Sequence, residues 1–172
     1  LAIPGIRHAS VTDFAMDTVE DRFDALYIMD VEQRDRVNNV MTASKDHDGN
    51  TIIPNVTHTA ASFAGRAIDN SFGAAYFPDS IIDIEDGNGN RLAPPSVAVL
   101  GAIAKGDNVS GRPYLAPAGF SRATLDDSIQ ALQLNLERED LDKLYQERIN
   151  PLVTFSGGDP VVWGQKTLQM DA

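Results

Sequence analysis

The residues best suited to binding a metal ion lie at positions 46–50, which read Asp-His-Asp-Gly-Asn. This order resembles the opening of an EF-hand calcium loop, in which oxygen ligands alternate along the chain. Such a loop also needs a glycine at its sixth position and a bidentate glutamate at its twelfth. Counted from Asp46, those positions hold Thr51 and Thr57. The pattern therefore favours an acidic turn, and we predict no metal site here.

A second motif could supply a nucleophile. Residues 119–123 read Gly-Phe-Ser-Arg-Ala, which differs in one residue from the Gly-x-Ser-x-Gly elbow of many serine hydrolases. The elbow follows a buried strand, whereas Pro113 and Pro117 precede Ser121 here, and proline is excluded from central strands. We predict a structural loop. A serine hydrolase built around Ser121 is kept as an alternative, which loss of activity in Ser121→Ala would support.

The remaining candidates for chemistry are histidines and glycine-rich loops. The histidines, His8, His47 and His58, are too far apart in sequence for a local metal-binding pair. His58 falls in the first turn of a predicted helix, where a solvated or capping role is expected. The chain contains neither a Gly-x-x-x-x-Gly-Lys phosphate loop nor a Gly-x-Gly-x-x-Gly dinucleotide loop. We therefore predict no catalytic, cofactor-binding or metal-binding residues, and a protein that is not an enzyme.

Composition limits the partners that the chain can have. Its 172 residues are enough for one domain with a hydrophobic core. A net charge of −11 argues against a nucleic-acid partner, and no apolar run reaches the roughly 20 residues that span a bilayer. The absence of cysteine excludes disulfides and thiolate zinc sites. The chain begins with Leu1 rather than Met, so we expect it to be a piece of a longer protein.

The first half of the chain predicts alternating strands and helices. Residues 1–20 mix turn formers with scattered apolar residues and are expected to be a connecting segment. An apolar run bounded by acids at 24–30 predicts a strand buried on both faces. Apolar residues at helical spacing predict a helix over 56–69, with Asn55 as its N-cap. Further elements are expected as a helical stretch at 31–41, strands at 73–77 and 81–84, and a hairpin turn at 85–91.

The second half is expected to complete the sheet. Residues 97–104 are apolar on nearly every side and predict a well-covered helix, with Ser96 as its N-cap and Gly106 as its end. Trp163, the only tryptophan, is expected on a strand packed against a helix, so Trp163→Ala should cost roughly 3–5 kcal/mol. Further elements are expected as strands at 132–136, 152–155 and 161–168, an acidic helix at 140–145 and a rigid proline-containing loop at 111–119. The expected fold class is α/β (α+β), a mixed β-sheet flanked by α-helices.

Four motifs follow one another in this half of the chain. They are Arg-Pro-Tyr-Leu-Ala-Pro-Ala-Gly-Phe at 112–120, the helix with its Leu-Tyr end at 140–145, Ile-Asn-Pro-Leu at 149–152 and, after Gly157-Gly158, Val-Trp-Gly-Gln-Lys-Thr-Leu at 162–168. The ordered set resembles the tail sheath proteins of contractile-tailed bacteriophages, and residues 20–30 resemble the first core strand of that family. Arg148 stands where the family usually has glycine, so the turn there is expected to be made differently. Residues 60–78 follow the family pattern only loosely.

The resemblance implies a division of the chain and a truncation. Residues 1–20 would connect to a sheath-like core domain at 21–172, which would be cut short at its C-terminus. The whole chain would be a fragment that lacks the N-terminal and C-terminal arms of the family. Because those arms add strands to neighbouring subunits, the fragment alone is expected to be monomeric.

The resemblance also implies a structural function. Sheath subunits surround the tail tube and contract to drive it through the host envelope during genome delivery. The implied partners are copies of itself in a helical sheath, the tail tube protein and the baseplate, with no nucleic acid and no membrane. The implied location is the virion, after assembly in the cytoplasm of the bacterial host. The alternative within the same machinery is another structural component, from a bacteriocin, a secretion-system sheath or a baseplate.

Overall fold

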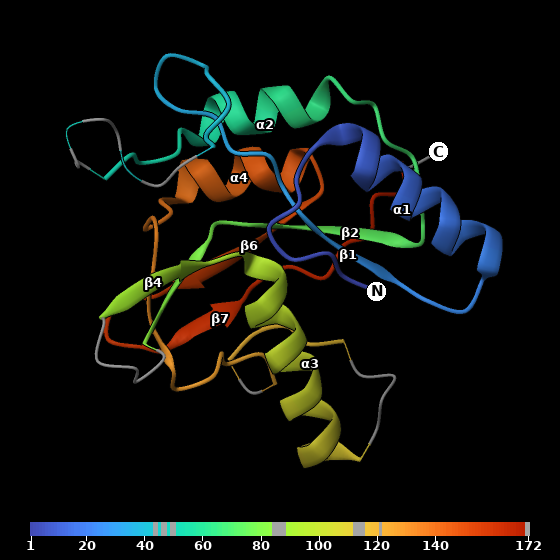
Figure 1. Ribbon diagram of the computed structural model, residues 1–172. Helices are drawn as coiled ribbons and strands as arrows, with labels where there is room; N and C mark the ends of the chain where they lie inside the picture. Colours follow the sequence, from blue (N-terminus) through green and yellow to red (C-terminus); the bar gives the residue numbers. More distant parts are fainter. Residues whose placement is uncertain are drawn as a thin grey trace.

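The computed structural model describes the whole chain except residues 43–44, 46–47, 49–50, 84–88, 112–115, 121 and 171–172. Figure 1 shows helices on both sides of a central sheet. The elements are α1 (Ala9–Arg22), β1 (Tyr27–Asp30), α2 (Val56–Ala64), β2 (Gly73–Phe77), β3 (Ser80–Asp83), β4 (Asn90–Ala93), α3 (Pro95–Ser110), β5 (Ile129–Leu132), α4 (Arg138–Gln146), β6 (Ile149–Thr154) and β7 (Pro160–Val162). Helices and a mixed sheet occur as the sequence predicts, so the expected α/β (α+β) class is confirmed.

The central sheet has four strands in the order β1-β2-β6-β7. Strands β1, β2 and β6 are parallel, while β7 returns antiparallel to β6. A smaller antiparallel sheet has the order β4-β3-β5. Because the three parallel strands are covered on both faces, they carry continuous apolar runs rather than an alternating pattern. The predicted strand buried on both faces is therefore confirmed in β1, where all four residues are buried.

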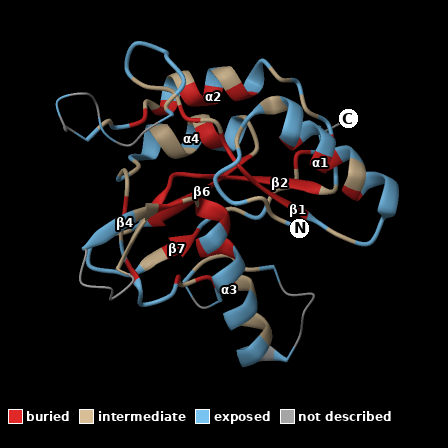
Figure 2. Ribbon diagram, in the orientation of Figure 1, coloured by how far each residue is buried: buried red, intermediate tan, exposed pale blue. Residues whose placement is uncertain are grey.

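One face of the central sheet is covered by α1, α2 and α4. Side chains from alternate strand positions, such as Tyr27 and Met29 of β1, pack there against Met16, Phe63 and Leu144 of the helices. Figure 2 shows the buried residues concentrated on the strands and on the inner sides of these helices. Asn55 caps α2 by accepting a hydrogen bond from the backbone N–H of His58, as predicted. The helix ends at Ala64, five residues before the predicted end.

The other face of the central sheet is covered by α3 and the smaller sheet. The intervening strand positions, including Ile28 and Tyr76, pack there against Val99 and Leu132. The two clusters use opposite sides of the same strands, which follows from the alternation of side chains along a strand. The molecule is thus three layers deep.

Helix α1 differs from the expected connecting segment. Residues Thr12, Ala15, Met16 and Val19 are buried on its inner side, so this part of the chain belongs to the core. The helix has no acidic residue in its first turn, and His8 occupies the N-cap position. The usual signals for a helix start are therefore missing from the sequence. The expectation of a connecting segment is wrong for residues 9–20, while the division into 1–20 and 21–172 stays a prediction.

Three further expectations are corrected by the structure. Residues 31–41 form a turn and an isolated bridge between Arg34 and Val40 rather than a helix. The strand expected at 132–136 lies at Ile129–Leu132 instead. Helix α3 runs on to Ser110, past the expected stop at Gly106, and its cap position is held by Pro94 rather than Ser96.

Helix α3 is also less covered than expected. Val97, Leu100 and Val109 are exposed, while Ala98, Val99 and Ala102 are buried. Only one side of this apolar helix therefore packs on the sheet. None of the helices in the described part of the chain is long and apolar enough to cross a membrane.

Candidate functional site

The two motifs that suggested chemistry fall partly outside the residues that the structure describes. Ser121 lies outside the described residues, as do Asp46, His47, Gly49 and Asn50. Among the residues that are described, no group of three or more histidine, cysteine, aspartate or glutamate side chains is arranged to hold a metal ion.

The two described histidines take structural positions. The Nδ1 atom of His58 lies 3.0 Å from the carbonyl oxygen of Asp35, which ties α2 to the preceding loop. His8 caps α1, and its Nδ1 atom lies 2.8 Å from Oγ of Ser10 and also accepts the Ser10 backbone N–H. A serine–histidine pair of this kind activates a nucleophile only when a third group orients the ring. Within the described part of the chain, no carboxylate hydrogen-bonds to His8, so the pair reads as a helix cap.

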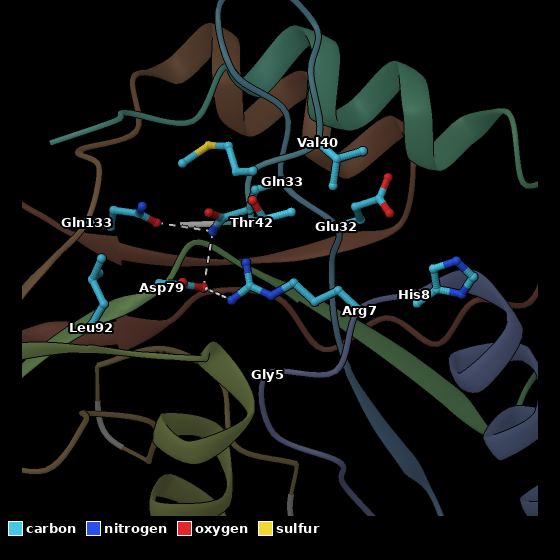
Figure 3. A pocket seen from close by; sticks show the side chains of 11 residues that line it. Gly5, Arg7, His8, Glu32, Gln33, Val40, Thr42, Asp79, Leu92 and Gln133 are labelled. Carbon is cyan, nitrogen blue, oxygen red and sulfur yellow. Dashed lines mark hydrogen bonds and ion pairs between the residues drawn. The ribbon is translucent and has the colours of Figure 1, made fainter. Parts of the chain in front are cut away.

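A cleft of about 440 Å³ opens where β1 and β2 end, and it holds a buried polar network. Arg7 forms an ion pair with Asp79, with 2.6 Å between Nη2 and Oδ1. The Nε2 atom of Gln33 donates to Asp79 and to Oε1 of Gln133, both at 3.1 Å. Figure 3 shows Arg7 pointing toward Asp79, and Gln33 between Asp79 and Gln133. The network joins the N-terminal segment to the ends of β1, β2 and β5.

A second carboxylate anchors the N-terminal segment close to the cleft, through Gly5. Asp30, the last residue of β1, is buried and accepts hydrogen bonds from the backbone N–H of Gly5, the backbone N–H of Ser96 and the Ser96 hydroxyl, at 2.7–2.9 Å. The acceptor lies at the N-terminus of α3, where a negative charge is favourable. Ser96 thus serves as a donor to Asp30 rather than as the predicted cap.

The electrostatics of the cleft fit a structural role for this network. Burial raises the pKa of the Asp79 carboxyl above its ordinary value, and the neighbouring Arg7 guanidinium opposes that shift. Within the described part of the chain, none of the buried side-chain nitrogen or oxygen atoms that lack a hydrogen-bond partner belongs to this network. The arrangement holds three chain segments together.

A different surface is formed by three exposed or half-buried aromatic side chains. Trp163 packs against Phe155 and Phe120, with ring centroids 4.8 Å and 5.5 Å apart, and is 43% exposed. The residue follows the last position of β7. The expectation that Trp163 lies on a strand packed against a helix is therefore wrong, because the residue follows β7 and packs on Phe155 and Phe120. The strand expected at 161–168 thus ends at Val162, and the chain beyond it runs past Asn150.

The C-terminal motif is held in place by the motif before it. The side chain of Asn150 accepts the backbone N–H of Lys166 at 2.7 Å and donates to the Lys166 carbonyl at 2.8 Å. Gly164 lies directly against Asn150, where an added Cβ would be 2.6 Å from its Oδ1 atom. Leu168 is fully buried and bridges to Gly73 of β2 through its backbone N–H. The motifs at 149–152 and 162–168 thus hold each other in place through these contacts, which we call the interlock. Local sequence patterns did not reveal these contacts.

The turn before this interlock is also resolved. Arg148 has a φ of 59°, in the left-handed region that glycine favours. The arginine therefore adopts a glycine-like backbone where glycine was expected. Its Nη1 atom donates to the Leu168 carbonyl at 3.2 Å, which adds a contact that glycine lacks.

Comparison with curated proteins gives partial but clear matches. No family model matches the chain. The tail sheath protein of Vibrio phage KVP40 is 39% identical over 83 residues, which make up 48% of this chain and 12% of that protein. The tail sheath protein of Enterobacteria phage T4 is 40% identical over 79 residues, or 45% of this chain and 12% of that protein. The matched segment is thus a small part of each relative.

Comparison with solved structures covers nearly the whole chain. The helical sheath of the anti-feeding prophage in its contracted state has a TM-score of 0.59 and 18% identity over 98% of this chain and 38% of that chain. The contracted sheath of the extracellular injection system PVC has a TM-score of 0.55 and 18% identity, over 86% of this chain and 34% of that chain. A chain in the baseplate structure of the anti-feeding prophage has a TM-score of 0.53 and 17% identity, over 91% of this chain and 33% of that chain. Just under half of the chain is therefore similar in sequence to a segment of two phage tail sheath proteins, and most of the chain shares its fold with proteins of contractile injection systems.

Proposed function

We propose that the protein is a structural part of a contractile tail sheath subunit, which surrounds a tail tube and shortens to drive that tube through the host envelope. The observation that carries this proposal is the identity of about 40% to two phage tail sheath proteins. The proposed partners are copies of the same subunit, the tube protein and the baseplate. The proposed location is the virion, after assembly in the host cytoplasm.

The fold suits a body that moves as a unit. Contraction by rearrangement requires subunits that stay rigid while their interfaces repack. Here both faces of the central sheet are filled, and the networks at Asp30, Asp79 and Asn150 tie its loops to it. A body with a filled core and anchored loops supports a mechanical role.

The direct test is assembly of the full-length parent protein. We expect the parent, co-expressed with its tube protein, to form hollow contractile cylinders around a thinner tube, visible by electron microscopy. A matched pair of variants separates folding from assembly, because Leu144→Asp would disrupt the core while Asp17→Ala changes an exposed position. A folded parent that stays monomeric beside assembled tubes would argue against the proposal.

A baseplate role is the second candidate, because the structural similarity extends to a baseplate. Localisation in intact particles separates the two roles. Antibody labelling along the whole tail supports a sheath subunit, while labelling at one end only supports a baseplate component.

A serine hydrolase around Ser121 is tested separately. We expect the chain to be inert towards activated esters, and Ser121→Ala to leave any background rate unchanged. Turnover that Ser121→Ala abolishes would overturn the structural proposal.

A further inference from the structure

We infer that a pocket between the start of α1 and the side of α2 binds an oxyanion, either a phosphate-type ion or a carboxylate. The pocket has a volume of about 270 Å³ and is lined by Arg7, His8, Arg34 and Arg66, with Glu32 as the lining carboxylate. Three arginines and a histidine thus converge on one pocket in a chain whose net charge is −11. Such a concentration of donors is unusual on an acidic protein and points to an anionic ligand.

Two of these arginines carry a buried N–H group without an acceptor. The Nε atoms of Arg34 and Arg66 are buried and have no hydrogen-bond partner. The side chains themselves are only 25% and 16% exposed. An unpaired buried donor is costly, and native proteins satisfy nearly all of them. Both arginines line the pocket, so a ligand oxygen that reaches either Nε–H group would supply its missing acceptor.

The other guanidinium nitrogens are held in place by the protein. Arg34 pairs with Glu32 at 2.8 Å and donates to the carbonyl of Asn38 at 3.2 Å. Arg66 donates to Thr12 at 2.7 Å and pairs with Asp13. Each arginine is therefore oriented in advance, so binding would not need to order a flexible side chain.

The charge of the pocket is balanced pair by pair. Arg7, Arg34 and Arg66 pair with Asp79, Glu32 and Asp13 respectively. The ligand would therefore be recognised by the unused N–H groups and their fork geometry rather than by a large net charge. Guanidinium groups bind carboxylate and phosphate oxygens in this way. Figure 3 shows His8 and Glu32 at the same end of the larger cleft, which shares these two residues and Arg7 with the pocket.

Two sources could supply the same chemistry. One is a free anion from solution. The other is an aspartate or glutamate side chain from a second copy of the chain, which has 25 such residues. The first source does not depend on the proposed sheath role, so the site and that role can fail separately.

The test uses NMR of the arginine Nε–Hε groups in the 172-residue chain. Phosphate is added at constant ionic strength, with chloride as the balancing anion, and acetate is used in a parallel titration. We expect the Arg34 and Arg66 signals to shift in a saturable way. Arg36, which is exposed and close in sequence, is the internal control and should not move.

Substitution sharpens the test. Arg34→Lys keeps the positive charge but removes the Nε donor, so we expect phosphate to bind about tenfold more weakly, equivalent to one charge-assisted hydrogen bond. Arg36→Lys is the matched control and should leave the affinity unchanged. If Arg34→Lys does not fold, the wild-type titration still decides the question.

A dilution series separates the two sources. If raising the protein concentration in phosphate-free buffer moves the same two signals, and phosphate reverses the change, a second copy supplies the carboxylate. If only added anions move them, the ligand is a free anion. If neither phosphate, acetate nor protein concentration moves them, or if Arg36 moves equally, the inference is overturned.

Discussion

At the scale of single residues, Trp163 shows how the surroundings of a side chain determine its contribution to stability. It packs on Phe155 and Phe120 but keeps 43% of its surface exposed. We therefore expect Trp163→Ala to lower the free energy of unfolding by about 1–2 kcal/mol, less than for a buried tryptophan. Urea denaturation measures this, and wild-type fluorescence should show a partly solvated indole. A loss of the size expected for a buried core residue would contradict the exposed placement.

Asp79 predicts a dependence of stability on pH. Burial raises the pKa of its carboxyl in the folded state, so the folded protein binds this proton more tightly than the unfolded chain. The resulting stabilisation is fully present below the ordinary pKa of 3.8 and is lost as the pH rises through the raised folded value. We expect the unfolding free energy of the wild type, minus that of Asp79→Asn, to fall with rising pH across this window.

The control for this measurement is Val40→Ala, which lies in the same cleft and does not titrate. Its difference from the wild type should stay flat over the same pH range. If the difference in unfolding free energy between wild type and Asp79→Asn grew with pH, the ion pair with Arg7 would outweigh the effect of burying the carboxyl.

At the scale of elements, α1 tests whether the N-terminal segment is part of the core. Met16 is 2% exposed and packs against the sheet, while Phe14 on the same helix is 73% exposed. We expect Met16→Ala to cost about 2–5 kcal/mol and Phe14→Ala to stay within about 0.5 kcal/mol. Chemical denaturation of both variants gives the comparison. Equal effects would mean that α1 is not docked as the structure places it.

The interlock between β6 and the C-terminal motif is tested by two glycine substitutions. An alanine Cβ at Gly164 would meet Asn150 at 2.6 Å, whereas one at Gly101 of α3 meets nothing within 4 Å. We expect Gly164→Ala to cost about 1–3 kcal/mol through overpacking. Gly101→Ala should instead stabilise α3 by about 0.5–1 kcal/mol. Thermal unfolding of the pair decides, and a neutral Gly164→Ala would show that the contact with Asn150 is loose.

The elements that could be predicted from sequence are those whose burial is visible in a local pattern. Strand β1 is apolar up to its last residue, Asp30, because both its faces are covered, and α2 has a cap and a clear apolar stripe. Helix α1 was missed because Val11 and Phe14 lie on its exposed side. Apolar residues therefore occur on all sides of the helix, and the helical periodicity is not visible in the sequence. The strand was wrongly expected at 132–136 because Leu134 and Leu136 alternate with polar residues there. They lie in a loop and pack on the same core residues as α1, α2 and α4.

The candidate sites were harder to predict because their residues meet only in the fold. Gln33 and Gln133 are 100 positions apart in the chain, yet share a hydrogen bond. Arg7, Arg34 and Arg66 likewise come from three separate segments, and no local spacing links them. The motif at 162–168 could be recognised from its place in the order of motifs along the chain. Its contact with Asn150 could not be predicted without knowing the path of the backbone.

At the scale of the whole molecule, charge opposes association while exposed apolar groups favour it. The net charge of −11 makes copies of the chain repel one another. Val97, Leu100 and Trp163 offer exposed apolar surface that salt does not weaken. Salt screens the repulsion, since the Debye length falls from about 10 Å at 0.1 M to about 3 Å at 1 M.

We therefore expect the chain to sediment as a monomer at low salt and to associate weakly as sodium chloride is raised. Sedimentation velocity over a salt series measures this, and Leu100→Asp is expected to reduce the association at high salt. Long tubes that form spontaneously from this chain at low salt would contradict the expected monomer. Association that weakens with salt would mean that opposite charges, rather than apolar groups, hold the copies together, because screening acts against attraction and repulsion alike.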